Sequence, residues 1–162
     1  MSQQSNRKPF SEELYKAGLV AEEFILKAIR ANPECFGITD MKKTIIVKNP
    51  DIYGCDILIL EMQPDRLWKP VLAVEVMVRS CITYPSIYIE QNKLRFCKDD
   101  SLPTWFVIVN KEFTEALVLS GDKAKLDSYS TATTNFNSSG TDEINIVVPR
   151  EQFETWELTN AS

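Results

Sequence analysis

The 162-residue chain contains no histidine, which excludes serine–histidine and cysteine–histidine catalysis and histidine-based metal sites. Its five glycines fit neither the GxGxxG nor the GxxxxGK[S/T] spacing, so the sequence has no glycine-rich phosphate loop. Four widely separated cysteines form no Cys-x-x-Cys pair, and they predict reduced, mostly buried thiols rather than a zinc site or a disulfide framework. Carboxylates and lysines remain as the main catalytic groups, and carboxylates suit hard cations such as Mg²⁺.

Long apolar runs are absent as well. No stretch of about 18 apolar residues predicts a membrane span, and the polar residues 1–9 do not resemble a signal peptide. We therefore expect a cytoplasmic protein with a disordered lead-in over residues 1–9 and a single domain over residues 10–162. The net charge of −5 argues weakly against nucleic-acid binding, although a local basic stripe would be sufficient for it.

The hydrophobic pattern predicts a first helix that begins at an N-cap, Ser11, and ends before Asn32-Pro33. Its apolar face would carry Ala21 and Ile25, among others. Glu22 falls on the flank of that face, so its carboxylate either leans out to water or points into an active site.

Later segments alternate between strand-like and helix-like patterns. A second helix is expected from Tyr84-Pro85 to Lys98, a long loop over residues 128–141, and a short terminal helix from Arg150 to Leu158. The order of elements predicts an α/β fold in which helices flank a central mixed β-sheet. The expected strands are Thr44–Lys48, Asp56–Leu60, Val71–Val78, Thr104–Val109, Ala116–Ser120 and Ile144–Val148.

Two acidic residues lie where strands should enter the core. Asp56 opens the second strand, and Glu75 lies inside the third, on the face that alternation also gives to Met77 and Arg79. A buried carboxylate is costly unless it is paired or binds a cation. Asp56 could instead cap a turn, Asp51 could take its place, and Arg79 could be the partner of Glu75.

These two acids and one lysine suggest phosphodiester hydrolysis, which needs a metal-activated water and a cation near the developing charge. If the second and third strands pair as a hairpin, Asp56 and Glu75 can face one cleft and hold the metal. Lys93, at the edge of the apolar stripe of the expected second helix, can reach inward and serve as the cation. An ordinary solvated lysine is the alternative, with Gln91 or Arg79 in its role.

This arrangement resembles the PD-(D/E)xK nuclease superfamily, in which a helix carries an acid, one strand carries Asp and the next carries Glu-x-Lys. The matching positions are Glu22, Asp56 and Glu75-Val76-Met77, and Met77 stands where the lysine belongs. The pattern is similar to a restriction-endonuclease family abundant in cyanobacteria, in which the lysine has moved to the following helix. Lys93 matches that migrated lysine in its distance from the segment Ser101-Leu-Pro-Thr-Trp-Phe-Val-Ile-Val.

The resemblance implies a restriction-endonuclease-like α-β-β-β-α-β core and a Mg²⁺- or Mn²⁺-dependent endonuclease that acts on DNA. Its catalytic residues would be Glu22, Asp56, Glu75 and Lys93, with Asp56 and Glu75 as the metal ligands. Met77 and the acidic composition favour an alternative, a catalytically inactive nuclease-fold module that binds DNA or a protein. A homodimer is expected, since two cuts on a duplex need two sites. Candidate phosphate contacts are Lys42, Lys43, Lys48, Arg95 and Lys98.

A small-molecule-binding α/β domain is a further alternative. Its pocket walls would be Trp68, Trp105 and Trp156, although tryptophans more often belong to a core.

Overall fold

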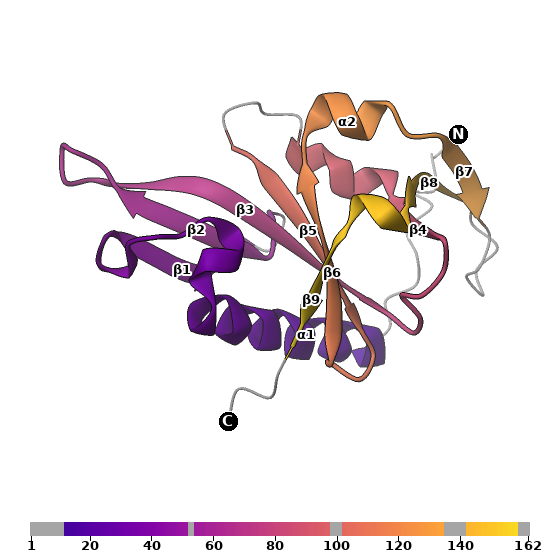
Figure 1. Cartoon of the computed structure of the whole chain (residues 1–162), viewed down its shortest axis with the longest axis horizontal. Coiled ribbons are helices and arrows are strands. Elements are labelled where there is room, and N and C mark those ends of the chain that lie inside the picture. The colour runs from indigo at the N-terminus through magenta and orange to yellow at the C-terminus, as the bar shows by residue number, and fades with distance from the viewer. Residues whose placement is uncertain (1–11, 52–53, 98–101, 135–141, 159–162) are drawn as a thin grey trace, which may run out of the picture.

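Two β-sheets organise the computed structural model, which describes residues 12–51, 54–97, 102–134 and 142–158 (Figure 1). The larger sheet has six strands in the order β1-β2-β3-β5-β6-β9, and the smaller has three in the order β4-β8-β7. Only β3 and β5 pair in parallel among the described strands, and the other neighbours are antiparallel. The predicted mixed sheet of an α/β fold is therefore confirmed. The expected lead-in over residues 1–9 lies outside the described residues.

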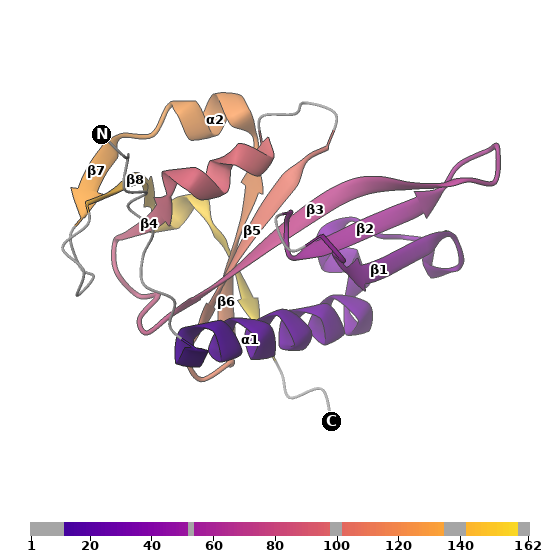
Figure 2. The same ribbon diagram turned by 180° about the vertical axis from the view of Figure 1, so that it is seen from behind.

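The first helix, α1 (Glu12–Ala31), packs along one face of the large sheet (Figure 2). Ala21, Ile25 and Ile29 are fully buried against side chains of the central strands, as the apolar face predicted. The proposed N-cap Ser11 lies outside the described part of the chain. Two 3₁₀ helices, η1 (Pro33–Phe36) and η2 (Met41–Lys43), lead from α1 to β1.

Strand β3 (Trp68–Arg79) is the central element of the large sheet. It forms an antiparallel hairpin with β2 (Ile57–Met62), which pairs in turn with β1 (Thr44–Lys48). Residues 72–77 are all buried, as expected for a strand covered on both faces. Val74 and Val76 pack toward α1, whereas Met77 packs on the opposite face, so the predicted alternation is confirmed.

The face opposite α1 is covered by the smaller sheet rather than by a long helix (Figure 2). Apolar side chains of β5 and β6, such as Phe106 and Leu117, pack there against Ile87 and Ile146 of the smaller sheet. The remaining elements are β4 (Ser86–Glu90), β5 (Thr104–Asn110), β6 (Glu115–Gly121), α2 (Lys123–Asp127), β7 (Thr131–Thr134) and β8 (Glu143–Pro149).

The helix expected from Tyr84-Pro85 to Lys98 is wrong. The chain forms β4 and then a 3₁₀ helix, η3 (Gln91–Cys97). Ile87 and Ile89 are buried at the two-residue period of a strand, and β4 pairs with β8 over its whole length. This pairing supplies backbone hydrogen bonds that outweigh the helical spacing of the same residues.

The terminal helix expected over Arg150–Leu158 is also wrong. A short 3₁₀ helix, η4 (Arg150–Gln152), precedes β9 (Glu154–Glu157), which pairs with β6. Trp156 and Leu158, two residues apart, pack on the core beneath α1. The expected loop over 128–141 contains β7, and residues 135–141 lie outside the described residues.

Candidate functional site

Asp56 and Glu75 are held side by side by the backbone of β3. Asp56 lies immediately before β2, and its amide donates a hydrogen bond to the Val74 carbonyl oxygen at 3.2 Å. The Val76 amide donates in turn to Oδ2 of Asp56 at 2.7 Å. Asp56 therefore bonds to the residue on each side of Glu75, which fixes both acids at one level of the sheet. The aspartate does more than cap a turn.

Lys93 pairs with Glu75. Its Nζ lies 2.5 Å from Oε1 of the glutamate, whose side chain is only 2% exposed, while the lysine side chain is 33% exposed. The lysine comes from η3 and not from the predicted long helix. Burial alone would lower the pKa of Lys93, but the charge and hydrogen bond of Glu75, with Asp56 as a further negative neighbour, outweigh burial and raise it. Lys93 is therefore a fixed cation at neutral pH.

Glu22 faces Asp56 from α1. Its side chain, 20% exposed, hydrogen-bonds with Asp56, and its Oε2 lies 3.5 Å from Nζ of Lys48. Burial is the largest cause that raises the pKa of Glu22; the charge of Asp56 and the hydrogen bond to it act in the same direction, and Lys48 opposes them. Of the two placements considered for Glu22, the structure shows the one that points toward Asp56.

Elements distant in sequence thus bring together the three acids Glu22, Asp56 and Glu75 and the two lysines Lys48 and Lys93. Two carboxyl groups share a hydrogen bond only when one of them holds a proton, so Glu22 and Asp56 together carry one negative charge while their bond is made, and the five groups then sum to zero. Crowded carboxylates are stabilised by a bound cation. The sequence predicted Lys48 only as a phosphate contact and did not place it beside the acids, although its position at the end of β1, the neighbour of β2, was a usable signal.

The other residues considered for these roles lie elsewhere. Asp51 is exposed in the turn after β1. Arg79 donates to the carbonyl oxygens of Val78 and Tyr88. Met77, at the usual lysine position, is buried in the apolar cluster on the face opposite α1. Its side chain therefore contributes to packing, and the amine beside Glu75 comes from η3.

Cys55 lies beside the acids. Burial raises the pKa of Cys55 to about 11, and the nearby charges of Glu75 and Asp56 act in the same direction. Its thiol is therefore protonated at neutral pH. The prediction of mostly buried cysteines is wrong for Cys35, which is exposed, and for Cys81, which is half-buried. The side chain of Cys97 lies outside the described residues.

The donor set fits a hard cation with a partly open coordination sphere. Within the described ranges, no group of three or more histidine, cysteine, aspartate or glutamate side chains is arranged to hold a metal ion. Mg²⁺ does not need such a cage, because one or two carboxylates, several waters and substrate phosphates commonly complete its shell. Asp56 and Glu75 would supply those two carboxylates.

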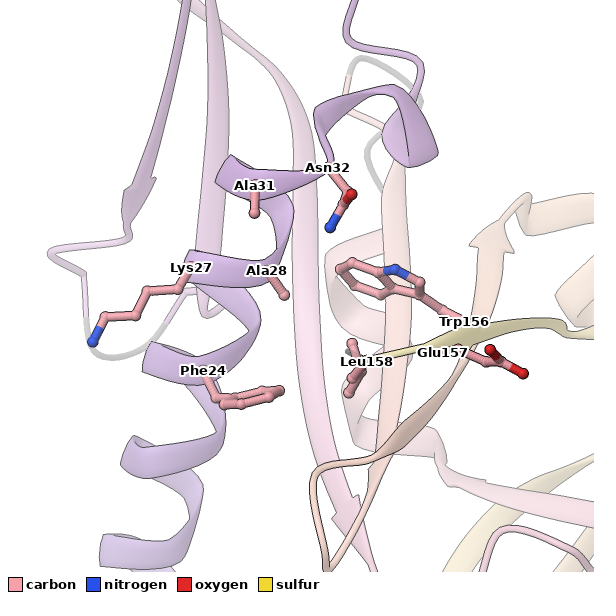
Figure 3. A pocket seen from close by; sticks show the side chains of 8 residues that line it. All are labelled: Phe24, Lys27, Ala28, Ala31, Asn32, Trp156, Glu157 and Leu158. Carbon is pink, nitrogen blue, oxygen red and sulfur yellow. The ribbon is translucent and has the colours of Figure 1, made fainter. Parts of the chain in front are cut away.

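A cavity of about 200 Å³ lies between α1 and β9 (Figure 3). Trp156 lines it with Phe24 and Leu158, and none of the acids described above does. Trp105 instead packs against Phe36, and Trp68 is exposed on the β2–β3 hairpin. The small-molecule hypothesis required the three tryptophans to line one pocket, and they do not.

Comparison with known proteins gives a fold and no family. Neither a family model nor a curated protein matches this chain. The structure of D212, a nuclease from a fusselovirus, is similar with a TM-score of 0.51 and 14% sequence identity, over 85% of this chain and 86% of that one. No helix in the described part of the chain is long and apolar enough to cross a bilayer. The chain has an α/β nuclease-like fold, with α1 packed on a central mixed sheet.

Proposed function

We propose that the protein is a Mg²⁺- or Mn²⁺-dependent endonuclease that acts on DNA. The observation that carries the proposal is the meeting of Asp56 and Glu75 with Lys93, whose Nζ lies 2.5 Å from Glu75. Three separate chain elements contribute these groups. The likeness of the fold to that of a viral nuclease supports the same conclusion.

Asp56 and Glu75 would hold the divalent cation, which would supply a Lewis acid and an activated water. The amide of Val76 fixes the Asp56 carboxylate, so little reorganisation is needed on binding. Lys93 keeps the buried Glu75 ionised before a cation arrives, and its positive charge then stabilises the charge that develops on the phosphate. Glu22 positions Asp56 through their hydrogen bond.

The test is cleavage of supercoiled and branched DNA with Mg²⁺ or Mn²⁺, with EDTA as the metal-free control. Wild type is compared with Glu75→Gln, which keeps the side-chain shape and removes the charge. Glu61→Gln, an exposed glutamate on β2, is the matched control. We expect nicking by wild type and by Glu61→Gln, and none by Glu75→Gln of unchanged circular dichroism. Equal cleavage by all three proteins would overturn the proposal.

The second candidate is a nuclease fold without catalysis that binds DNA or a protein partner. The burial of Met77 at the usual lysine position favours it, because Lys93 must replace that amine from another element. Absence of cleavage by wild type with retained DNA binding would support this module. We also propose a homodimer, which sedimentation equilibrium tests by the mass of the particle.

A further inference from the structure

We propose that Lys48 is a second phosphate-binding residue of this site and contacts a DNA phosphate next to the one that is cleaved. The inference rests on the proposed function and adds a substrate contact to it. Lys48 and Lys93 flank the acids from two sides: Lys48 pairs with Glu22, and Lys93 pairs with Glu75. Asp56 interacts with Glu22 and contributes to the charge around Lys93.

The backbone holds Lys48 beside the acids. It is the last residue of β1 and pairs with Ile57, the residue after Asp56. The next amide, that of Asn49, donates to the Asp56 carbonyl oxygen at 2.9 Å. The segment that carries the lysine is thus fastened to the segment that carries the aspartate, which makes its position at the site a consequence of sheet register.

The contact between Lys48 and Glu22 is loose enough to be exchanged. The two charged atoms are 3.5 Å apart, and the lysine side chain is 39% exposed. Ion pairs that water can reach contribute little to stability. Lys93, by contrast, pairs with Glu75, whose carboxylate is almost fully buried. An incoming phosphate can therefore draw Lys48 away from Glu22 at small cost.

Salt dependence of DNA binding tests this contact. Affinity for a labelled duplex oligonucleotide is measured by fluorescence anisotropy in EDTA, so that no cleavage occurs, across a range of salt concentrations. One lost phosphate contact reduces the slope of log K against log[salt] by about 0.9, which corresponds to about eightfold weaker binding at 0.1 M salt. We expect this change for Lys48→Met and a smaller one for Lys48→Arg.

Lys27→Met is the matched control, because Lys27 makes an exposed pair with Glu23 on the same helix as Glu22 and carries the same charge. Equal loss in both methionine variants would mean a general charge effect and would overturn the proposal. An unchanged slope in Lys48→Met would overturn it as well.

The double variant Glu22→Gln/Lys48→Met separates contact from simple neutralisation of Glu22. If Lys48 binds phosphate, its removal weakens binding in the Glu22→Gln background too; if it only neutralises Glu22, that loss disappears and the proposal fails. Failure of the proposed function looks different, because wild type would then not cleave DNA with Mg²⁺ or Mn²⁺, whether or not it binds DNA. Wild-type cleavage together with an unchanged Lys48→Met slope refutes the Lys48 contact alone.

Discussion

Lys93→Met should destabilise the protein more than the loss of one lysine ordinarily does. Methionine keeps most of the apolar length of the side chain but leaves Glu75, 2% exposed, without the amine 2.5 Å away. Removing one partner of a buried ion pair costs about 3–5 kcal/mol. Because the lysine side chain is one-third exposed, water can relieve part of that cost, and we expect about 2–3 kcal/mol.

For a chain of this size, that loss corresponds to a fall in Tm of about 4–12 °C. Urea unfolding and calorimetry in EDTA measure it, with Lys27→Met as the control for an exposed pair. The double variant Glu75→Gln/Lys93→Met should recover much of the loss, since no buried charge remains. If the free energy of unfolding of Lys93→Met lies within about 0.5 kcal/mol of wild type, the range of ordinary surface substitutions, then Lys93 does not stabilise the buried Glu75.

Three further predictions follow from the pKa shifts. The pKa of Lys93 is raised above its usual 10.5 on folding, so the stability that this lysine contributes is complete below pH 10.5 and is lost as pH rises through the folded pKa. The difference in free energy of unfolding between wild type and Lys93→Met, measured in urea, should therefore become smaller at alkaline pH. A difference that stays constant with pH would contradict this. The raised pKa of Glu22 means that the folded state holds the proton of Glu22 more tightly than the unfolded state, so this group's contribution to stability is lost as pH rises from 4.5 through the folded pKa. Glu22→Gln lacks this loss, so its free energy of unfolding should rise relative to that of wild type across the same pH range, as urea titrations at several pH values can measure. Parallel stability curves for the two proteins would contradict this. With a pKa of about 11 and a buried thiol, Cys55 should be alkylated by iodoacetamide far more slowly than the exposed Cys35 at pH 7.5, as peptide mass spectrometry can measure; equal rates would mean that Cys55 is accessible.

The central strands could be predicted because their signal is local. Continuous apolar residues over 72–77 indicate a strand buried on both faces, and one glutamate among them stands out. Lys93 was named as the cation of the site, but Arg79 was considered as the partner of Glu75, and the element that carries Lys93 was not predicted. That element depends on β4, whose pairing joins Ser86 to Pro149, far along the chain. A five-residue strand with two inward isoleucines is compatible with either period until its partner is known.

Dependence on partners that are distant in sequence also explains why the C-terminal strand and the direction of Glu22 could not be predicted. Residues 154–157 become a strand because β6 offers an edge to pair with, which their own spacing does not reveal. The direction of Glu22 is set by Asp56 and Lys48, two residues from other elements. Flank positions on a helix are ambiguous in sequence because a small rotation moves them between core and water.

Mn²⁺ binding gives the most direct test of the central claim, that Asp56 and Glu75 hold a hard cation. Electron paramagnetic resonance of free Mn²⁺ counts the ions taken up by wild type and by the Asp56→Asn/Glu75→Gln variant. We expect a Mn²⁺ site in wild type that the variant loses while its circular dichroism stays unchanged. Equal uptake by the two proteins, or none by wild type in the presence of DNA, would contradict it.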